Sequence, residues 1–280
     1  MKTNPARASL KAGQPSVGTW LALPDATLAG LMSTTGFAWL TVELEHSPAS
    51  METAADCFAI IAASGCVPLA RIPWNTGENI KRVLDTGAFG VVVPMVNTRA
   101  EAEAVVKAAR YRPIGERSVG GQLHAARFET DGTTYYAKAN DEILVVVMAE
   151  HVEAIRNIDE ILSVPGIDAV FIGPNDLHAS MGLVPAFDSE NPEFNAALKK
   201  VFASAKAHGV APGIHVADAA QARRRLDEGW QMIAVASEVG FMLGKASEAV
   251  QSLGLSQSGP MARPRRRRRA LRMVGCRAYA

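Results

Sequence analysis

The amino-acid sequence predicts a (β/α)8 barrel, the TIM-barrel architecture, in a chain of 280 residues. Three observations predict it. Continuously apolar runs of strand length recur along the chain, segments with helical apolar spacing alternate with them, and the length suits one barrel of about 250 residues. Runs without polar alternation are typical of parallel strands that are covered on both faces. An open, doubly wound sheet is the alternative, but the glycine-rich phosphate-binding sequence that follows its first strand is missing.

The expected elements follow one another in a regular order. The strands are 17–23, 37–42, 67–72, 91–96, 144–149, 169–172, 211–216 and 232–236. The helices that follow them are 26–35, 51–64, 79–86, 100–110, 152–162, 192–208, 219–228 and 241–252. An irregular stretch, 111–134, and a short helix at 135–140 precede the fifth strand. Eight is the number of strands that closes a barrel of this class.

The charged residues divide the chain into two expected parts. Residues 256–280 contain eight arginines and no acid, so subtracting eight from the 29 basic residues leaves 21 against 28 acidic ones in 1–255. We expect a (β/α)8 barrel at 1–255, with a net charge near −7, and an Arg-rich, disordered tail at 256–280. Because no aromatic residue interrupts the arginine run 265–269, we expect no nucleic-acid partner.

The cysteines and the N-terminal residues predict a cytoplasmic protein. Cys57, Cys66 and Cys276 have neither the spacing of metal ligands nor that of a disulfide framework, so we expect free thiols in a reducing compartment. The first residues lack the apolar segment of a signal peptide. No run approaches the roughly 18 apolar residues that span a membrane, so we expect no membrane partner.

Two carboxylates follow expected strands. The fifth strand ends in Glu150, and the sixth is followed by Gly173-Pro174-Asn175-Asp176, where a helix can begin. Taken alone, Asp176 is explained by a helix cap. Because the carboxyl ends of all the strands of a barrel meet at one rim, Glu150 and Asp176 are expected there together. Two carboxylates without cysteine favour Mg²⁺ or Mn²⁺ over a structural Zn²⁺.

Further ionisable residues are expected at the same rim. Glu43, Glu45 and His46 follow the second strand, Arg71 ends the third, and His215 lies within the seventh. Each of them alone fits an exposed loop or a surface ion pair, but together with the two carboxylates they predict a metal-assisted active site. The remaining histidines are expected at the surface or with satisfied ring nitrogens: His124, His178 and His208.

Several short sequences occur in the order and spacing of a known family. They are Gly18-Thr19-Trp20-Leu21, Gly36-Phe37-Ala38-Trp39, Glu45-His46-Ser47-Pro48, Arg71-Ile72-Pro73-Trp74, Val93-Pro94-Met95-Val96 and Gly173-Pro174-Asn175-Asp176-Leu177. Over about residues 8–252 the chain resembles the class II, metal-dependent pyruvate aldolases of the 4-hydroxy-2-oxoheptanedioate aldolase type, in the aldolase/citrate lyase family. The resemblance implies a carbon–carbon lyase that reversibly cleaves a 4-hydroxy-2-oxo acid to pyruvate, or a close analogue, and an aldehyde.

The resemblance also implies a role for each residue. Glu150 and Asp176 hold a divalent cation, Mg²⁺ or Mn²⁺, with Co²⁺ as a further candidate. His46 is the acid–base group, acting directly or through a water, Arg71 neutralises the enolate oxygen, and Asp85, from a neighbouring turn or subunit, orients both. The residues implied in catalysis are Glu43, His46, Arg71 and Asp85, and those implied in substrate binding are Arg71, Met148, Gly173, Pro174, Asn175 and Asp176. The implied assembly is a homo-oligomer, a hexamer built from dimers that exchange their last helix.

Three positions depart from the pattern of the family. Glu43 stands where an aspartate is common, which keeps the charge but lengthens the side chain. Ser118 replaces a glycine in the loop 117–120. Met148 stands where a glutamine often faces pyruvate, and a thioether cannot replace an amide donor. Met148 therefore leaves open a second function, in which the same site acts on another enolate partner such as an oxaloacetate- or citrate-like acid.

A third hypothesis is not catalytic. In it the barrel is a scaffold and the arginine-rich tail binds nucleic acid or another acidic surface. The set of charges at the strand ends argues against this as the main role, because a scaffold does not need them.

Overall fold

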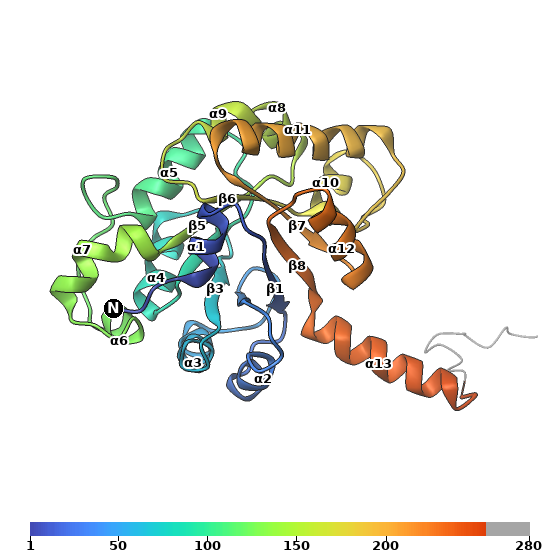
Figure 1. The fold of residues 1–280 in the computed structure, drawn as a ribbon, viewed down its shortest axis with the longest axis horizontal. Coiled ribbons are helices and arrows are strands. Elements are labelled where there is room, and N and C mark those ends of the chain that lie inside the picture. Colours follow the sequence, from blue (N-terminus) through green and yellow to red (C-terminus); the bar gives the residue numbers. More distant parts are fainter. Residues whose placement is uncertain (256–280) are drawn as a thin grey trace, which may run out of the picture. The chain divides into compact units, whose positions relative to one another are not determined.

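Eight parallel strands close into a barrel, as the sequence predicts. The computed structural model describes residues 1–255, so the arginine-rich tail at 256–280 lies outside the described residues. The strands are β1 (Ser16–Leu21), β2 (Trp39–Glu43), β3 (Val67–Arg71), β4 (Gly90–Val93), β5 (Leu144–Met148), β6 (Ala169–Ile172), β7 (Ala211–Val216) and β8 (Met232–Ser237). Each strand pairs with the next, and β8 pairs with β1 to complete the closed barrel (Figure 1).

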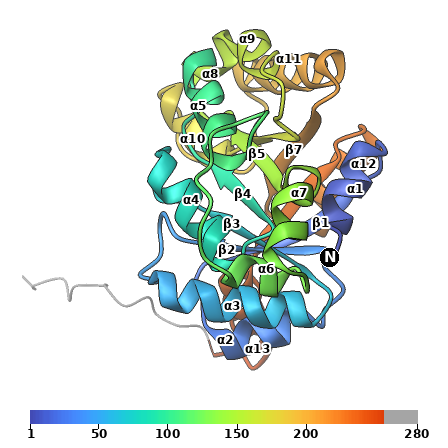
Figure 2. The ribbon, with the colours of Figure 1, turned by 90° about the vertical axis from the view of Figure 1, so that its left-hand side faces the viewer.

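The helices lie between the strands along the chain, and Figure 2 shows α3, α4 and α5 on the outer side of the strands. The first half comprises α1 (Pro5–Lys11), α2 (Ala26–Met32), α3 (Met51–Ala63), α4 (Gly77–Thr86), α5 (Arg99–Ala109), α6 (Leu123–Arg127) and α7 (Gly132–Glu142). The second half comprises α8 (Val152–Arg156), α9 (Ile158–Leu162), α10 (Pro174–Ser180), α11 (Pro192–His208), α12 (Ala219–Asp227) and α13 (Glu238–Ser252). The barrel unit comprises Met1–Phe241. None of the helices among the described residues is long and apolar enough to cross a membrane.

The structure differs from the expected elements in identifiable ways. The helix expected at 152–162 is two short helices, α8 and α9, which meet at Asn157. The strand expected at 91–96 ends at Val93, because Met95 has a φ of +54°, outside the range of a strand. The helices α1 and α6 were not expected, and of α10 only the start was expected. They have seven residues or fewer, which is too short for helical apolar spacing to be recognised.

The pairing register determines which side chains point into the barrel. Met148 on β5 pairs with Phe171 on β6, which pairs with Gly213 on β7. Paired residues of parallel strands project to the same face, and Phe171 stacks on Trp20 of the distant strand β1 with ring centroids 5.5 Å apart. This row therefore points into the interior. Two residues further towards the carboxyl ends, the inward positions are Glu150, Gly173 and His215.

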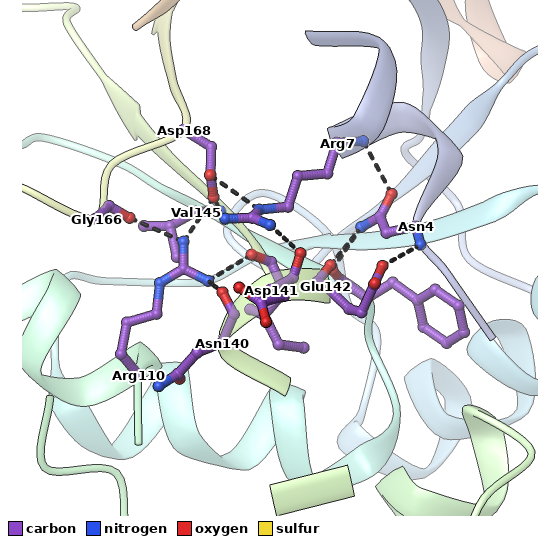
Figure 3. Close-up of polar contacts among 11 residues, drawn as sticks. Asn4, Arg7, Arg110, Asn140, Asp141, Glu142, Val145, Gly166 and Asp168 are labelled. Atoms are coloured by element: carbon purple, nitrogen blue, oxygen red, sulfur yellow. Dashed lines mark hydrogen bonds and ion pairs between the residues drawn. The ribbon is translucent and has the colours of Figure 1, made fainter. Parts of the chain in front are cut away.

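A buried ionic network lies at the amino ends of the strands (Figure 3). Asp168, just before β6, pairs with Arg7 of α1 at 2.9 Å and with Arg110, at the end of α5, at 2.6 Å. Asn4 caps α1 and donates to the carbonyl oxygens of Phe89 and Glu142, each at 3.0 Å. Arg110 donates further to the carbonyl oxygens of Asn140, Ile143 and Gly166. The network joins α1 to the starts of β4, β5 and β6, at the end of a barrel that serves stability.

We expect Asp168→Ala to lower the free energy of unfolding by about 3–5 kcal/mol, because two buried guanidinium groups lose their carboxylate. Denaturant unfolding of both proteins measures the difference. Glu248→Ala is the matched control. Glu248 pairs with Lys245 at 2.6 Å, the same distance as between Asp168 and Arg110, but both Glu248 and Lys245 are largely exposed. Its expected loss is below about 1 kcal/mol. Equal losses in the two variants would contradict a structural role for the network.

Candidate active site

Arg71 is held between two carboxylates at the rim of the barrel. It ends β3 and is paired in register with Glu43, which ends β2. Glu43 Oε2 lies 2.6 Å from both Nε and Nη2 of Arg71, and Glu45 Oε2 lies 3.0 Å from Nη1. Burial opposes the charge of Arg71, but Glu43 and Glu45 outweigh this effect and raise its pKa. The guanidinium, 5.9 Å from the centre of the Trp20 ring, is therefore a fixed positive charge.

The second carboxylate oxygen of Glu43 shapes the loop that follows β2. Its Oε1 accepts the backbone N–H groups of Glu45 at 2.6 Å and of His46 at 3.1 Å. One side chain thus holds Arg71 with one oxygen and the His46 loop with the other, and glutamate is long enough for both. The His46 side chain is 64% exposed, and its Nε2 lies 3.8 Å from Glu45 Oε2. Burial raises the pKa of Glu45, while Arg71 and His46 oppose the shift.

Glu150 presents a buried carboxylate oxygen to the interior. Its Oε1 accepts the N–H of Met95 at 2.9 Å, whereas its Oε2 is buried and bonds to no described residue. Burial raises the pKa of Glu150 to about 7, against the N–H of Met95 and the charge of Arg71, while Asp176 and Glu45 raise it further. Met95 adopts its left-handed conformation where it donates to Glu150. Such backbone strain is found at functional sites, where the surrounding contacts hold a residue in an unfavourable conformation.

Gly173 makes room for this carboxylate. A Cβ at residue 173 would lie 2.4 Å from Glu150 Oε2 and 3.1 Å from Cε of Met148, so any larger residue would displace the Glu150 carboxylate. Pro174 then opens α10, and Asn175 and Asp176 are exposed in its first turn. Met148 is buried at 3% exposure and offers an apolar thioether beside Glu150 and Gly173. The structure therefore brings together the residues expected after the fifth and sixth strands.

The oxygens at this rim suit a hard divalent cation. Glu150 Oε2 is free of other bonds, and Asp176 lies within electrostatic reach of it. Among the described residues, no group of three or more His, Cys, Asp or Glu side chains is placed to hold a metal ion. A cation held by Glu150 and Asp176 would thus take its other oxygen ligands from substrate and water, as Mg²⁺ commonly does.

Asp85 lies apart from these residues within its own chain. It is in the last turn of α4, where its carboxylate pairs with the buried Arg117 at 2.6 Å. It bonds to neither His46 nor Arg71 among the described residues. A role for Asp85 at the rim would therefore require the site of a second subunit.

His215 also lies at the rim, as the sequence predicts, although no catalytic or binding role was expected of it. It is on the same inward row as Glu150 and Gly173, and its Nε2 donates to the carbonyl oxygen of Ala236 at 2.8 Å. Burial lowers the pKa of His215 to about 4, helped by the charge of Arg71 and opposed by the Ala236 carbonyl and Glu43. The register of β7, which continues the inward row of β5 and β6, is the signal that could have identified it.

The low pKa of His215 predicts a pH dependence of stability. The folded value of about 4 lies below the ordinary 6.5, so the unfolded chain takes up a proton that the folded one refuses. The contribution of the neutral ring to the free energy of unfolding is therefore fully present above pH 6.5 and is lost as the pH falls towards 4. We expect the wild-type protein to lose about 2 kcal/mol more than His215→Leu between about pH 7 and 4.5. Denaturant unfolding at both pH values measures this, and equal losses would contradict a ring that the fold keeps neutral.

Cavity size alone would not have located this site. A cavity of about 520 Å³ lies on the outside of the barrel, where it is lined by residues of α11 and α12 such as Phe202, Arg225 and Glu228. Its arginine is already paired with Glu228 and with Asp188. At the rim, by contrast, Glu150 Oε2 bonds to no residue that the structure describes.

Comparisons with known proteins agree with this geometry. The sequence model described as HpcH/HpaI aldolase/citrate lyase matches residues 16–244. The 4-hydroxy-2-oxo-heptane-1,7-dioate aldolase of Shigella flexneri is 39% identical over 261 residues, covering 93% of this chain and 97% of that protein. A solved HpcH/HpaI aldolase/citrate lyase family protein from Burkholderia cenocepacia J2315 superposes with a TM-score of 0.83 at 31% identity, covering 90% of this chain and all of that one. The citrate synthase SbnG gives a TM-score of 0.79 at 25% identity over 89% and 96% of the two chains. The chain belongs to the HpcH/HpaI aldolase/citrate lyase family.

Proposed function

We propose that the protein is a divalent-metal-dependent carbon–carbon lyase that reversibly cleaves a 4-hydroxy-2-oxo acid to pyruvate, or a close analogue, and an aldehyde. The observation that carries the proposal is the buried, unbonded Oε2 of Glu150, which faces the barrel interior at the rim where Arg71 is fixed. The similarity to a 4-hydroxy-2-oxo-heptane-1,7-dioate aldolase supports it. The cytoplasmic location expected from the sequence is part of the same proposal.

Glu150 and Asp176 would hold the cation, Mg²⁺ or Mn²⁺ with Co²⁺ as a further candidate. When bound, the cation polarises the keto oxygen of the oxo acid and favours enolate formation. The first-turn N–H groups of Asn175 and Asp176 are the candidates for binding the substrate carboxylate. Met148, Gly173 and Pro174 would line the wall beside the oxo acid.

His46 and Arg71 would carry the proton and the charge. His46 Nε2 accepts the proton of the C4 hydroxyl as the C3–C4 bond breaks, and the electron pair of that bond stays on the oxo-acid fragment. A proton returned to C3 completes pyruvate, so the reaction needs no oxidant or reductant. Arg71 stabilises the negative charge on the enolate oxygen, and Glu43 positions both groups through its two carboxylate oxygens.

The site proposed here is completed by a second copy of the chain. Asp85 lies in the last turn of α4, where it pairs with Arg117 of its own chain, so it would orient His46 only across a subunit interface. On α13, Met242 and Leu243 are 49% and 62% exposed, which suits a helix exchanged between subunits. A homo-oligomer, a hexamer by resemblance, is the assembly we propose, and light scattering coupled to size-exclusion chromatography tests it.

Met148 and the likeness to a citrate synthase favour one alternative. In it the same residues act on another enolate partner, an oxaloacetate- or citrate-like acid, because the wall beside Glu150 is apolar rather than an amide donor. Comparing the turnover of oxaloacetate with that of 4-hydroxy-2-oxo acids separates the two.

The proposal is tested by pyruvate release from a panel of 4-hydroxy-2-oxo acids, with chelator and after restoring Mn²⁺ or Mg²⁺. We expect release that stops with chelator and returns with the cation. A folded protein that binds Mn²⁺ but releases no pyruvate from any of these acids would favour the alternative. A protein that releases pyruvate at an undiminished rate in chelator would contradict the assignment of Glu150 and Asp176.

A further inference from the structure

His215 has one ring nitrogen bonded and one free. Its Nε2 lies 2.8 Å from the carbonyl oxygen of Ala236, and because a carbonyl only accepts, the ring proton is on Nε2. Nδ1 therefore carries a lone pair. It bonds to no residue that the structure describes, and it is not enclosed by the protein. His178, by contrast, satisfies both of its nitrogens, with the Pro174 carbonyl and Ser189.

The surrounding rings fix the imidazole in place. Its centroid lies 5.4 Å from that of Trp20, and Phe187 packs edge-on at 5.0 Å. Burial and the nearby Arg71 keep the ring neutral, since its pKa is about 4. At neutral pH, Nδ1 is thus a fixed hydrogen-bond acceptor and never a donor.

The position of His215 places this acceptor at the proposed reaction site. Glu150, Gly173 and His215 occupy the same inward row on three consecutive strands, and the middle residue has no side chain. His215 also lies within electrostatic reach of Arg71 and Glu43. His215 therefore lies in the wall of the rim site near Arg71 and Glu43, and Nδ1 is the ring nitrogen that remains available to a substrate bound there.

We propose that His215 recognises a hydroxyl group of the substrate, whose hydrogen bond it accepts at Nδ1. This inference rests on the proposed function and extends it to a substrate class: 2-oxo acids with a hydroxyl group in addition to the one at C4. A keto group, a carboxylate or an alkyl group cannot donate to Nδ1, and Arg71 disfavours a cationic donor. The hydroxyl could belong to the oxo-acid half or to the aldehyde half, and the experiment distinguishes the two.

The test measures kcat/KM for aldol addition with two pairs of nearly isosteric substrates in the presence of Mg²⁺. Glycolaldehyde and propanal form the aldehyde pair, with pyruvate as donor; hydroxypyruvate and 2-oxobutanoate form the oxo-acid pair. We expect the wild-type protein to prefer the hydroxylated member of one pair, and His215→Leu to lower that preference about tenfold. His215→Gln, whose amide oxygen can accept, is expected to restore part of it.

Each outcome decides the inference. Loss of preference in the aldehyde pair assigns the hydroxyl to that half, and loss in the oxo-acid pair assigns it to the donor. An active His215→Leu protein with unchanged preferences in both pairs overturns the role of His215 and leaves the proposed function standing. A wild-type protein that catalyses no addition with any pair overturns the proposed function instead.

A second measurement needs no variant. In wild-type protein labelled with ¹⁵N-histidine and loaded with Mg²⁺, the unprotonated Nδ1 of His215 gives a resonance distinct from that of a protonated ring nitrogen. We expect it to shift when hydroxypyruvate or glycolaldehyde with pyruvate is added, and not with the matching 2-oxobutanoate or propanal. Identical spectra with the hydroxylated and the alkyl ligands would overturn the inference even if His215→Leu did not fold.

Discussion

Replacing Glu150 with glutamine is expected to remove cation binding and turnover while leaving the barrel folded. The amide keeps the shape of the side chain but is a poor ligand, so we expect Mn²⁺ affinity to fall by more than the ~10–100-fold that changes around metal ligands cause. Burial already raises the pKa of Glu150 to about 7, so the charge opposes folding and its removal is expected to preserve or raise stability. Isothermal titration with Mn²⁺ and thermal unfolding measure the two effects.

Glu153→Gln is the matched control for this change. Glu153 lies three residues later and is exposed at the start of α8, so its neutralisation changes the charge near the rim without touching the interior. It is expected to bind Mn²⁺ as the wild-type protein does. A Glu150→Gln protein with unchanged Mn²⁺ affinity and activity would show that the cation, if used, is held elsewhere.

Replacing Arg71 with lysine is expected to lower kcat/KM by about 100- to 1000-fold, mostly through kcat. The guanidinium contacts Glu43 through Nε and Nη2 and Glu45 through Nη1. A single ammonium group keeps the charge but cannot reach both carboxylates in this geometry. Steady-state kinetics on the best substrate of the panel measures the loss, and circular dichroism checks the fold.

Arg82→Lys serves as the control for Arg71→Lys. Arg82 is 56% exposed on α4, where it lies 4.0 Å from Glu78, and its replacement is expected to leave kcat unchanged. An Arg71→Lys enzyme that kept most of the wild-type kcat would rule out charge stabilisation by a fixed guanidinium as the main role of Arg71.

The barrel could be predicted because the sequences of its strands show little alternation of apolar and polar residues. The strands β2 to β6 are buried at every residue, so hydrophobicity alone identifies them. The convergence of Glu43, Arg71 and Glu150 followed from the same fact, because parallel strands present their carboxyl ends at one rim. The bounds of short elements such as α10 could not be predicted, because one or two helical turns are too short to show a hydrophobic periodicity.

The contacts that complete the site could not be predicted from spacing. Glu43 was expected to be catalytic, but its simultaneous contact with Arg71 and the loop at His46 depends on loop geometry. The partner of Asp85 depends on which surface of α4 packs against Arg117. His215 was expected at the rim, but only the strand register shows that it shares an inward row with Glu150.

The expectation for His124 was wrong. It was expected at the surface or with satisfied nitrogens, but it is fully buried and neither ring nitrogen bonds to a described residue. The sequence around it shows no apolar periodicity, yet it forms α6, which places the ring 4.4 Å from that of Tyr135. Packing between aromatic rings in connecting segments such as α6 and α7 produces no hydrophobic periodicity, so it could not be predicted from the sequence.

The central claim is that Glu150 and Asp176 hold a cation that lets the site form an enolate. Exchange of the pyruvate methyl protons with D₂O, followed by ¹H NMR, tests it without any knowledge of the aldehyde. The account predicts exchange that requires both protein and Mg²⁺ or Mn²⁺, stops with chelator, and is lost in Glu150→Gln but not in Glu153→Gln. Exchange that continues unchanged in chelator, or in Glu150→Gln, would contradict it.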